Sequence, residues 1–277
     1  MSRLQTLPVD ARPESLIRSH RVLRNTYALL AMTLLFSGTM ATISLLADLP
    51  HPGVLLTLVG YFGLFFLVHR YQNSALGLVW LFGLTGFMGL TLGPILNVYL
   101  THFAQGPQLV ALALAGTGFT FLGLSAYALI SRRDFGFLGG LLGTGILVAF
   151  LASLAVLFIP GVQGMAVGVS ALFVILMAGM ILFETSRIIH GGETNYIMAT
   201  VSLFVSIFNL FTSLLHLLGQ ASLRMEQALW PEDYERMTRE VEEALRQATD
   251  ANARSYTHEE VMQAMQERID RARDKPC

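Results

Sequence analysis

Two long stretches of this chain contain no Asp, Glu, Lys or Arg. The first covers the 61 residues from Tyr71 to Ser131, and the second covers the 49 residues from Phe135 to Phe183. A surface helix of a soluble domain needs a polar face toward water, and neither stretch provides one. Each stretch is roughly two to three times the ~20 residues that cross the ~30 Å hydrocarbon layer of a membrane. The pattern therefore predicts a polytopic membrane protein with two spans in each stretch.

Short polar segments containing Gly, Pro or Asn divide the apolar sequence further. Residues 48–53, 105–107 and 190–194 have this composition, which is typical of turns between helices. The sequence thus predicts an all-α fold, a bundle of seven transmembrane helices. The predicted spans are residues 26–47, 54–69, 75–96, 108–130, 135–159, 164–183 and 195–218.

The basic residues of the membrane part are confined to alternate connections. They precede the first span or follow spans two, four and six, at Arg12, Arg18, Arg21, Arg24, Arg70, Arg132, Arg133 and Arg187. Because cytoplasmic loops carry the excess of positive charge, we expect a multi-pass membrane protein with a cytoplasmic N-terminus. Seven spans then place the C-terminal tail on the opposite side of the membrane. If the last span is re-entrant, the tail returns to the cytoplasm.

Charge also divides the chain into segments. Residues 220–277 hold 9 basic and 13 acidic side chains, a net charge of −4, whereas the residues before them carry +3. We therefore expect a cytoplasmic segment (1–25), a transmembrane domain (26–219) and a charged tail. The tail contains two helix-start patterns, at 230–233 and 257–260, each followed by apolar residues at helical spacing. It is predicted to be a helical soluble extension, either a docking element for another chain or a solvated appendage.

Composition argues against several classes of function. The net charge of −1 leaves no basic stripe for nucleic acid. The single cysteine, Cys277, excludes a disulfide within the chain. The sequence contains no zinc-protease, nucleophile-elbow or phosphate-loop motif, so we expect no enzyme and no cofactor. His190 with Glu193 provides too few ligands for a metal site.

Glycines recur at four-residue spacing, which lets helices approach closely in a membrane. This spacing favours packing within the bundle over a seam between two copies of the chain. Pro94 is expected to end or kink the third span, because proline lacks the backbone N–H that continues a helix. The glycine pairs at four-residue spacing are Gly89 and Gly93, Gly136 and Gly140, Gly139 and Gly143, and Gly164 and Gly168.

Ionisable residues at membrane depth are costly and are candidates for function. Glu184 and Arg187 lie three residues apart on the sixth span and can pair on one helix face. Arg70, which closes the second span on the same side, is an alternative partner for Glu184. A buried carboxylate between cations would form a proton-sensitive latch, since protonation removes the attraction. The alternative is an ion pair that anchors the helix ends.

The last span carries a polar stripe. Asn209 and His216 are seven residues apart and share one helix face, and Ser202, Ser206 and Ser213 lie on or beside it. Such a stripe can line a water-filled path through the membrane. It can also supply hydrogen bonds between helices.

Several stretches resemble the bacterial YccA branch of the Bax-inhibitor (transmembrane Bax-inhibitor-motif) family. They are residues 20–27, 92–97, 181–186 and 188–197, followed by 199–203 and Asn209. The resemblance covers residues 18–219 and is specific from Ile181 to Ile197. It implies a seven-helix bundle with a central last helix, located in the bacterial inner membrane. The side on which seven spans place the tail is then the periplasm. The resemblance also implies a modulator that binds FtsH, a membrane-anchored ATP-dependent protease.

Other members of the wider family act as pH-sensitive calcium leak channels, with two facing aspartates and an arginine as the latch. By this resemblance Glu184 matches the first acid and Arg70 matches the arginine. Ser206 stands where the second aspartate is expected, which removes the chemistry of two carboxylates sharing a proton. The alternative function is therefore a cation leak for calcium or protons with a latch at Glu184. The tail lies beyond the resemblance.

Overall fold

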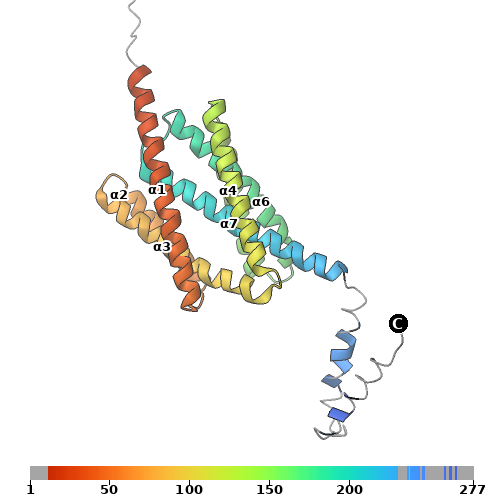
Figure 1. Cartoon of the computed structure of the whole chain (residues 1–277). Coiled ribbons are helices and arrows are strands. Elements are labelled where there is room, and N and C mark those ends of the chain that lie inside the picture. Colours follow the sequence, from red (N-terminus) through yellow and green to blue (C-terminus); the bar gives the residue numbers. More distant parts are fainter. Residues whose placement is uncertain are drawn as a thin grey trace, which may run out of the picture. The chain divides into compact units, whose positions relative to one another are not determined.

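The computed structural model describes residues 12–229 and, within the tail, residues 236, 238–243, 245, 246, 259, 262, 263 and 266. The regular secondary structure of this part is helical (Figure 1). Of the two helix starts predicted in the tail, residues 230–233 lie outside the described residues, and of residues 257–260 only Glu259 is described, as helical.

Within residues 12–229, seven long helices and one short 3₁₀ helix follow one another. Their bounds are α1 Arg12–Leu46, α2 Val54–Tyr71, α3 Ala75–His102, α4 Gly106–Ser131, α5 Leu138–Phe158, η1 Gln163–Met165, α6 Ala166–Ile189 and α7 Tyr196–Leu229. Each long helix contains a segment long and apolar enough to cross a membrane. The predicted all-α, seven-span membrane fold is confirmed, although α3, α6 and α7 continue past their predicted ends.

Helix α3 continues through Pro94 to His102, so of the two expectations for this proline, an ended or a kinked helix, the first is wrong. A proline at position 94 cannot donate to the carbonyl of Leu90, which would otherwise lack its helical partner. The hydroxyl of Ser44 on α1 donates to that carbonyl at 2.8 Å. A side chain from the neighbouring helix therefore replaces the hydrogen bond that proline removes.

The predicted close packing occurs where Gly89 and Gly93 of α3 face α1. A Cβ atom at Gly89 would collide with the Ser37 carbonyl oxygen, and one at Gly93 would collide with the side chain of Ser44. This glycine pair therefore packs within the bundle. By contrast, a Cβ atom at Gly140, Gly143, Gly164 or Gly168 would meet no heavy atom within 4 Å.

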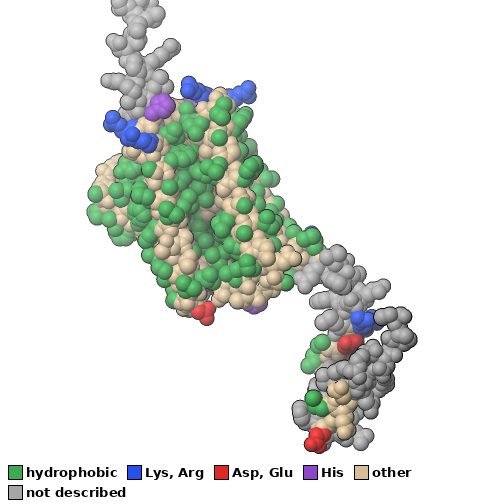
Figure 2. All heavy atoms as spheres, in the orientation of Figure 1, with side chains coloured by type: hydrophobic (Ala, Val, Ile, Leu, Met, Phe, Trp, Pro, Cys, Tyr) green, Lys and Arg blue, Asp and Glu red, His purple; other side chains and the backbone are tan. Residues whose placement is uncertain are grey.

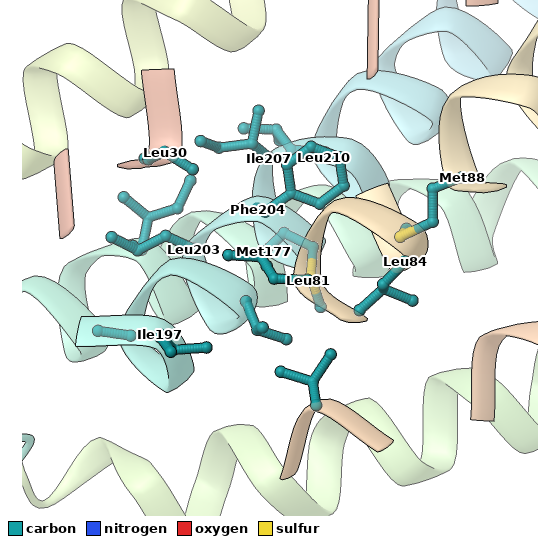
Figure 3. Close-up of a cluster of buried hydrophobic side chains, with 14 of the residues drawn as sticks. Leu30, Leu81, Leu84, Met88, Met177, Ile197, Leu203, Phe204, Ile207 and Leu210 are labelled. Atoms are coloured by element: carbon teal, nitrogen blue, oxygen red, sulfur yellow. The ribbon is translucent and has the colours of Figure 1, made fainter. Parts of the chain in front are cut away.

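The core of the bundle is built around α7 (Figure 3). Burial of apolar side chains from α1, α3 and α6 against this helix creates one cluster. The buried α7 residues in it are Ile197, Ala199, Val201, Leu203, Phe204, Ile207 and Leu210. The central last helix that the family resemblance implied is thus present.

Helices α2 and α5 present apolar side chains outward. Leu55 and Phe62 on α2, and Leu141 and Leu147 on α5, are exposed. Such exposure would be unfavourable in water, but lipid is as apolar as these side chains. These helices are therefore suited to the lipid-facing surface of the membrane domain.

Long-range hydrogen bonds gather several helix ends at one end of the bundle. The Tyr27 hydroxyl lies 3.3 Å from Thr185 Oγ1, which joins the first part of α1 to the end of α6. The Thr200 hydroxyl lies 3.4 Å from the Thr26 carbonyl and joins the start of α7 to the first part of α1. Figure 2 shows Arg side chains at this end and an acidic side chain at the opposite end. We call the first of these the basic end.

The chain divides into two compact units, Met1–Ser222 and Leu223–Cys277. In the second unit, residues 238–243 and 245–246 are helical. Val241 and Leu245, four residues apart, are both exposed there.

Candidate functional site

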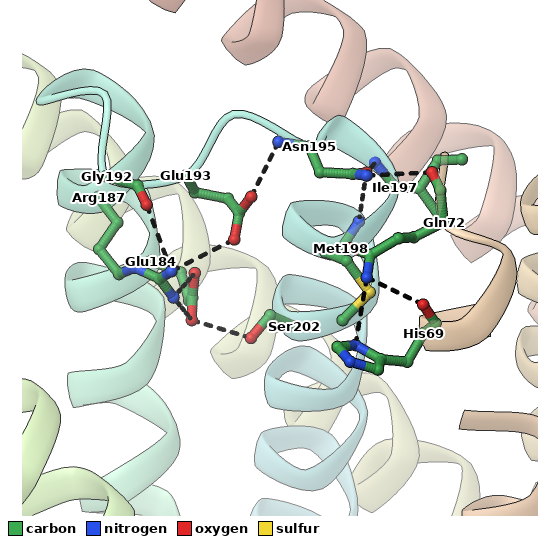
Figure 4. Close-up of polar contacts among 10 residues, drawn as sticks. All are labelled: His69, Gln72, Glu184, Arg187, Gly192, Glu193, Asn195, Ile197, Met198 and Ser202. Carbon is green, nitrogen blue, oxygen red and sulfur yellow. Dashed lines mark hydrogen bonds and ion pairs between the residues drawn. The ribbon is translucent and has the colours of Figure 1, made fainter. Parts of the chain in front are cut away.

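Glu184 and Arg187 lie on the last two turns of α6, at the basic end (Figure 4). Arg187 Nη1 is 3.2 Å from Glu184 Oε1 and 3.4 Å from Oε2. The Glu184 side chain is 3% exposed, whereas the Arg187 side chain is 34% exposed. The pair therefore joins a carboxylate inside the bundle to a cation at its edge.

Arg187 also binds a second carboxylate. Its Nη2 atom lies 3.3 Å from Glu193 Oε2 in the loop between α6 and α7. The same nitrogen is 3.5 Å from the Gly192 carbonyl oxygen. One guanidinium thus lies between two carboxylates and forms a charge-assisted hydrogen bond with each of them.

Ser202 connects Glu184 to α7. Its hydroxyl donates to Glu184 Oε1 at 3.0 Å. These groups, together with Phe65, Met198 and Val201, line a pocket of about 90 Å³. The carboxylate of Glu184 therefore links α6 to α7 directly, which an isolated ion pair on one helix would not do.

Asn195 holds the start of α7 and ties it to the loop between α2 and α3. Its Oδ1 atom accepts from the backbone N–H groups of Ile197 and Met198, at 2.9 and 3.2 Å, which is the geometry of a helix N-cap. Its Nδ2 atom donates to the Gln72 carbonyl and to Asn73 Oδ1, both at 3.0 Å. The side-chain amide of Asn195 therefore accepts hydrogen bonds as the N-cap of α7 and donates hydrogen bonds to the loop between α2 and α3.

The network closes through Glu193, whose Oε1 atom accepts from the Asn195 backbone N–H at 2.8 Å. We call Glu184, Arg187, Glu193, Asn195 and Ser202 the basic-end network. Sequence reasoning identified Glu184 and Arg187 but assigned no role to Asn195. A signal was present, because an asparagine directly before an apolar helix is typical of an N-cap.

Arg70 does not join this network. It is exposed at the end of α2, and its guanidinium carbon lies 5.6 Å from the centre of the Tyr71 ring. In the described part of the chain, the ion pair of Glu184 is formed with Arg187. The alternative pairing of Glu184 with Arg70 is therefore not present.

The polar stripe on α7 makes mostly local bonds. Ser206 donates to the Ser202 carbonyl at 2.8 Å, and Asn209 donates to the Val205 carbonyl at 2.8 Å. His216 Nε2 is buried without a hydrogen-bond partner among the described residues. Ser206 and Asn209 thus each donate one hydrogen bond to the backbone of their own helix, while Ser202 donates to Glu184 on another helix.

His190 does not face Glu193 as a metal ligand. Its ring nitrogens lie 2.9 Å from the Ser186 carbonyl oxygen and 3.1 Å from the Arg132 carbonyl oxygen. Across the described residues, no group of three or more His, Cys, Asp or Glu side chains is placed to hold a metal ion.

Residues 19–222 match the sequence pattern of the family described as inhibitor of apoptosis-promoting Bax1. The chain is 50% identical over 208 residues to the protein named modulator of FtsH protease YccA from Escherichia coli, a match that covers 75% of this chain and 94% of the relative.

Two further relatives match this chain over a similar number of residues. An uncharacterized protein of Pseudomonas aeruginosa is 53% identical over 200 residues, which cover 72% of this chain and 89% of that protein. A membrane protein of Vibrio cholerae is 42% identical over 216 residues, with 76% and 96% covered.

Proposed function

Since this chain belongs to the Bax-inhibitor family, we propose that it is a non-catalytic membrane protein that binds the protease FtsH and modulates its activity. The observation that supports this function is the 50% identity to a protein named as a modulator of FtsH, over 94% of that protein's length. The names of these relatives describe a modulator or membrane proteins rather than enzymes.

The proposal includes a location and an orientation. A second relative with the same 50% identity is named as an inner membrane protein. The arginines in the first half of α1, near the ends of α2 and α6 and directly after α4 favour a cytoplasmic basic end. The segment 1–25 then lies in the cytoplasm, where it is a natural handle for a protease, and the tail 220–277 lies in the periplasm.

Within this proposal, the basic-end network acts as a latch. Glu184, Arg187 and Ser202 hold α6 against α7, and Asn195 holds α7 against the loop after α2. If the partner recognises one arrangement of these helix ends, loosening the latch changes binding without removing any surface residue. A cation leak gains no comparable support, because none of the relatives described above is named as a channel.

The function is tested by measuring FtsH activity in cells. The full-length chain is produced in bacteria, and the half-life of a membrane-protein substrate of FtsH is followed after synthesis is stopped. We expect the chain to lengthen this half-life and to co-purify with FtsH. The variant lacking residues 1–20 should change both results.

The matched control lacks residues 230–277, which lie beyond the matched residues 19–222. It should behave as the full-length chain does. An unchanged substrate half-life with the full-length chain, together with no co-purification, would contradict the proposed function.

A further inference from the structure

The basic end carries five exposed arginines. Within the described part of the chain, these arginines form no ion pair, since the salt bridges found there belong to Arg187. The five are Arg21, Arg24, Arg70, Arg132 and Arg133. Unpaired charge of one sign attracts an anionic partner.

Arg132 and Arg133 differ from the other three because α6 holds their loop. Ser186 Oγ donates to the Arg133 carbonyl at 3.2 Å and accepts from the Phe135 backbone N–H at 3.0 Å. His190 Nε2 lies 3.1 Å from the Arg132 carbonyl. With the carbonyl of each arginine engaged in this way, the two side chains extend from a backbone that is fixed in place.

The nearby acidic side chain does not neutralise this pair. Asp134 Oδ1 accepts from the Gly136 backbone N–H at 2.7 Å, a bond within the loop. Among the described residues it takes part in no salt bridge. The loop therefore keeps both positive charges available to a ligand.

Strongly exposed apolar side chains flank the arginine pair. Ile130, in the last turn of α4, is 82% exposed, and Phe137, just before α5, is 78% exposed. Leu141 on α5 is exposed as well. By contrast, no large apolar side chain from residue 20 to residue 31, the stretch of α1 around Arg21 and Arg24, is exposed. Two cations beside an apolar surface at a helix end match a molecule with an anionic head and hydrocarbon tails.

We propose that the loop between α4 and α5 binds an anionic phospholipid, with the phosphate group on Arg132 and Arg133 and the acyl chains against Ile130 and Phe137. An acidic peptide in water would satisfy the charges but leave the two apolar side chains exposed. A phospholipid pairs with the two charges and also covers the two apolar side chains. The site is independent of the proposed action on FtsH, because it uses no residue of the basic-end network.

The test measures lipid binding to the purified full-length protein in a neutral detergent, by native mass spectrometry during titration with phosphatidylglycerol. We expect the double variant Arg132→Gln, Arg133→Gln to weaken binding by about fivefold for each arginine removed. The matched control, Arg21→Gln with Arg24→Gln, removes the same charge from α1 and should change binding less than about twofold. Equal losses in the two double variants would overturn the proposal, since they would show attraction to net charge alone.

A second variant separates a lipid from a free phosphate. Phe137→Ser keeps both arginines and should weaken phosphatidylglycerol binding, while glycerol phosphate at the same concentration should not compete with the lipid. Competition by glycerol phosphate, or unchanged lipid binding in Phe137→Ser, would overturn the assignment to a phospholipid. Phosphatidylcholine serves as the neutral lipid and should bind more weakly than phosphatidylglycerol.

Discussion

The two ends of the bundle are held together in different ways. At the basic end, Asn195 reaches residues 122 and 123 positions away, and Glu184 connects two helices. Toward the opposite end, α1 and α3 meet through Gly89 and Gly93 with almost no space between their backbones. Two long-range bonds between side chains also lie in this part of the bundle. The Tyr61 hydroxyl is 2.6 Å from Thr91 Oγ1, and Asn97 donates to Asp48 at 2.9 Å in an exposed bond.

This contrast indicates where each kind of change should matter. A chain of charged and amide groups is sensitive to the loss of one member, because its partners are left buried without a bond. A close backbone contact is insensitive to polar changes but does not accept added volume. Substitutions can therefore distinguish the polar network from the close backbone contact by the size of the change in the free energy of unfolding.

The largest effect is expected for Gly89→Val in the α1–α3 contact. The new side chain would collide with the Ser37 carbonyl, so the two helices must separate, at a cost of about 3 kcal/mol. The measurement is unfolding of the purified protein in detergent. Gly143→Val on α5 is the matched control, because a Cβ atom there meets nothing within 4 Å and should change stability by less than about 1 kcal/mol. Similar losses for both variants would show that α1–α3 packing is not special.

Glu184→Ala should be the most damaging change in the basic-end network. It removes the acceptor of Ser202 and one partner of Arg187, while Glu193 still binds Arg187. Because Arg187 is partly exposed, we expect a loss of about 2 kcal/mol, below the ~3–5 kcal/mol typical of a fully buried pair.

Glu184→Gln serves as the control for that variant. The amide keeps one acceptor oxygen for Ser202 or Arg187, but it removes the negative charge and replaces the second oxygen with a donor, so roughly half of the loss is expected. If Glu184→Ala were as stable as the original chain, the network would not hold α6 against α7.

Asn195→Ala should cost about 1 kcal/mol, chiefly through loss of the N-cap of α7. Asn195→Ser separates the two roles of this residue. Serine can still cap the helix, but it lacks the amide donors that reach Gln72 and Asn73. Stability should then be largely retained, while amide hydrogen exchange in residues 72–74 becomes faster. Identical amide exchange in Asn195→Ser and in the original chain would show that the hydrogen bonds to the α2–α3 loop do not stabilise it.

The sequence predicted those features that depend on neighbours along the chain. Continuous apolarity located the seven spans, and the three-residue spacing located the pair of Glu184 and Arg187. Features created by tertiary contacts were not predictable in the same way. Ser44 supports the helix beyond Pro94 from another helix, so α3 continues past residue 96, where the sequence predicted its end. Arg70 has the right position in the sequence to meet Glu184, but the structure leaves it exposed on Tyr71.

The smallest effect is expected at the end opposite the basic end, for Asp48. This residue has a φ angle of +45°, and its carboxylate accepts the exposed bond from Asn97. Asp48→Ala loses the bond and also places an alanine in the left-handed region, which together should cost roughly 1 kcal/mol or less. Asp48→Gly loses the same bond but adopts the positive φ without strain, so we expect a change below about 0.5 kcal/mol. Unfolding in detergent distinguishes the two. If Asp48→Gly proved as damaging as Glu184→Ala, the bond to Asn97 would hold its end of the bundle as strongly as the network holds the basic end, and the contrast between the two ends would fail.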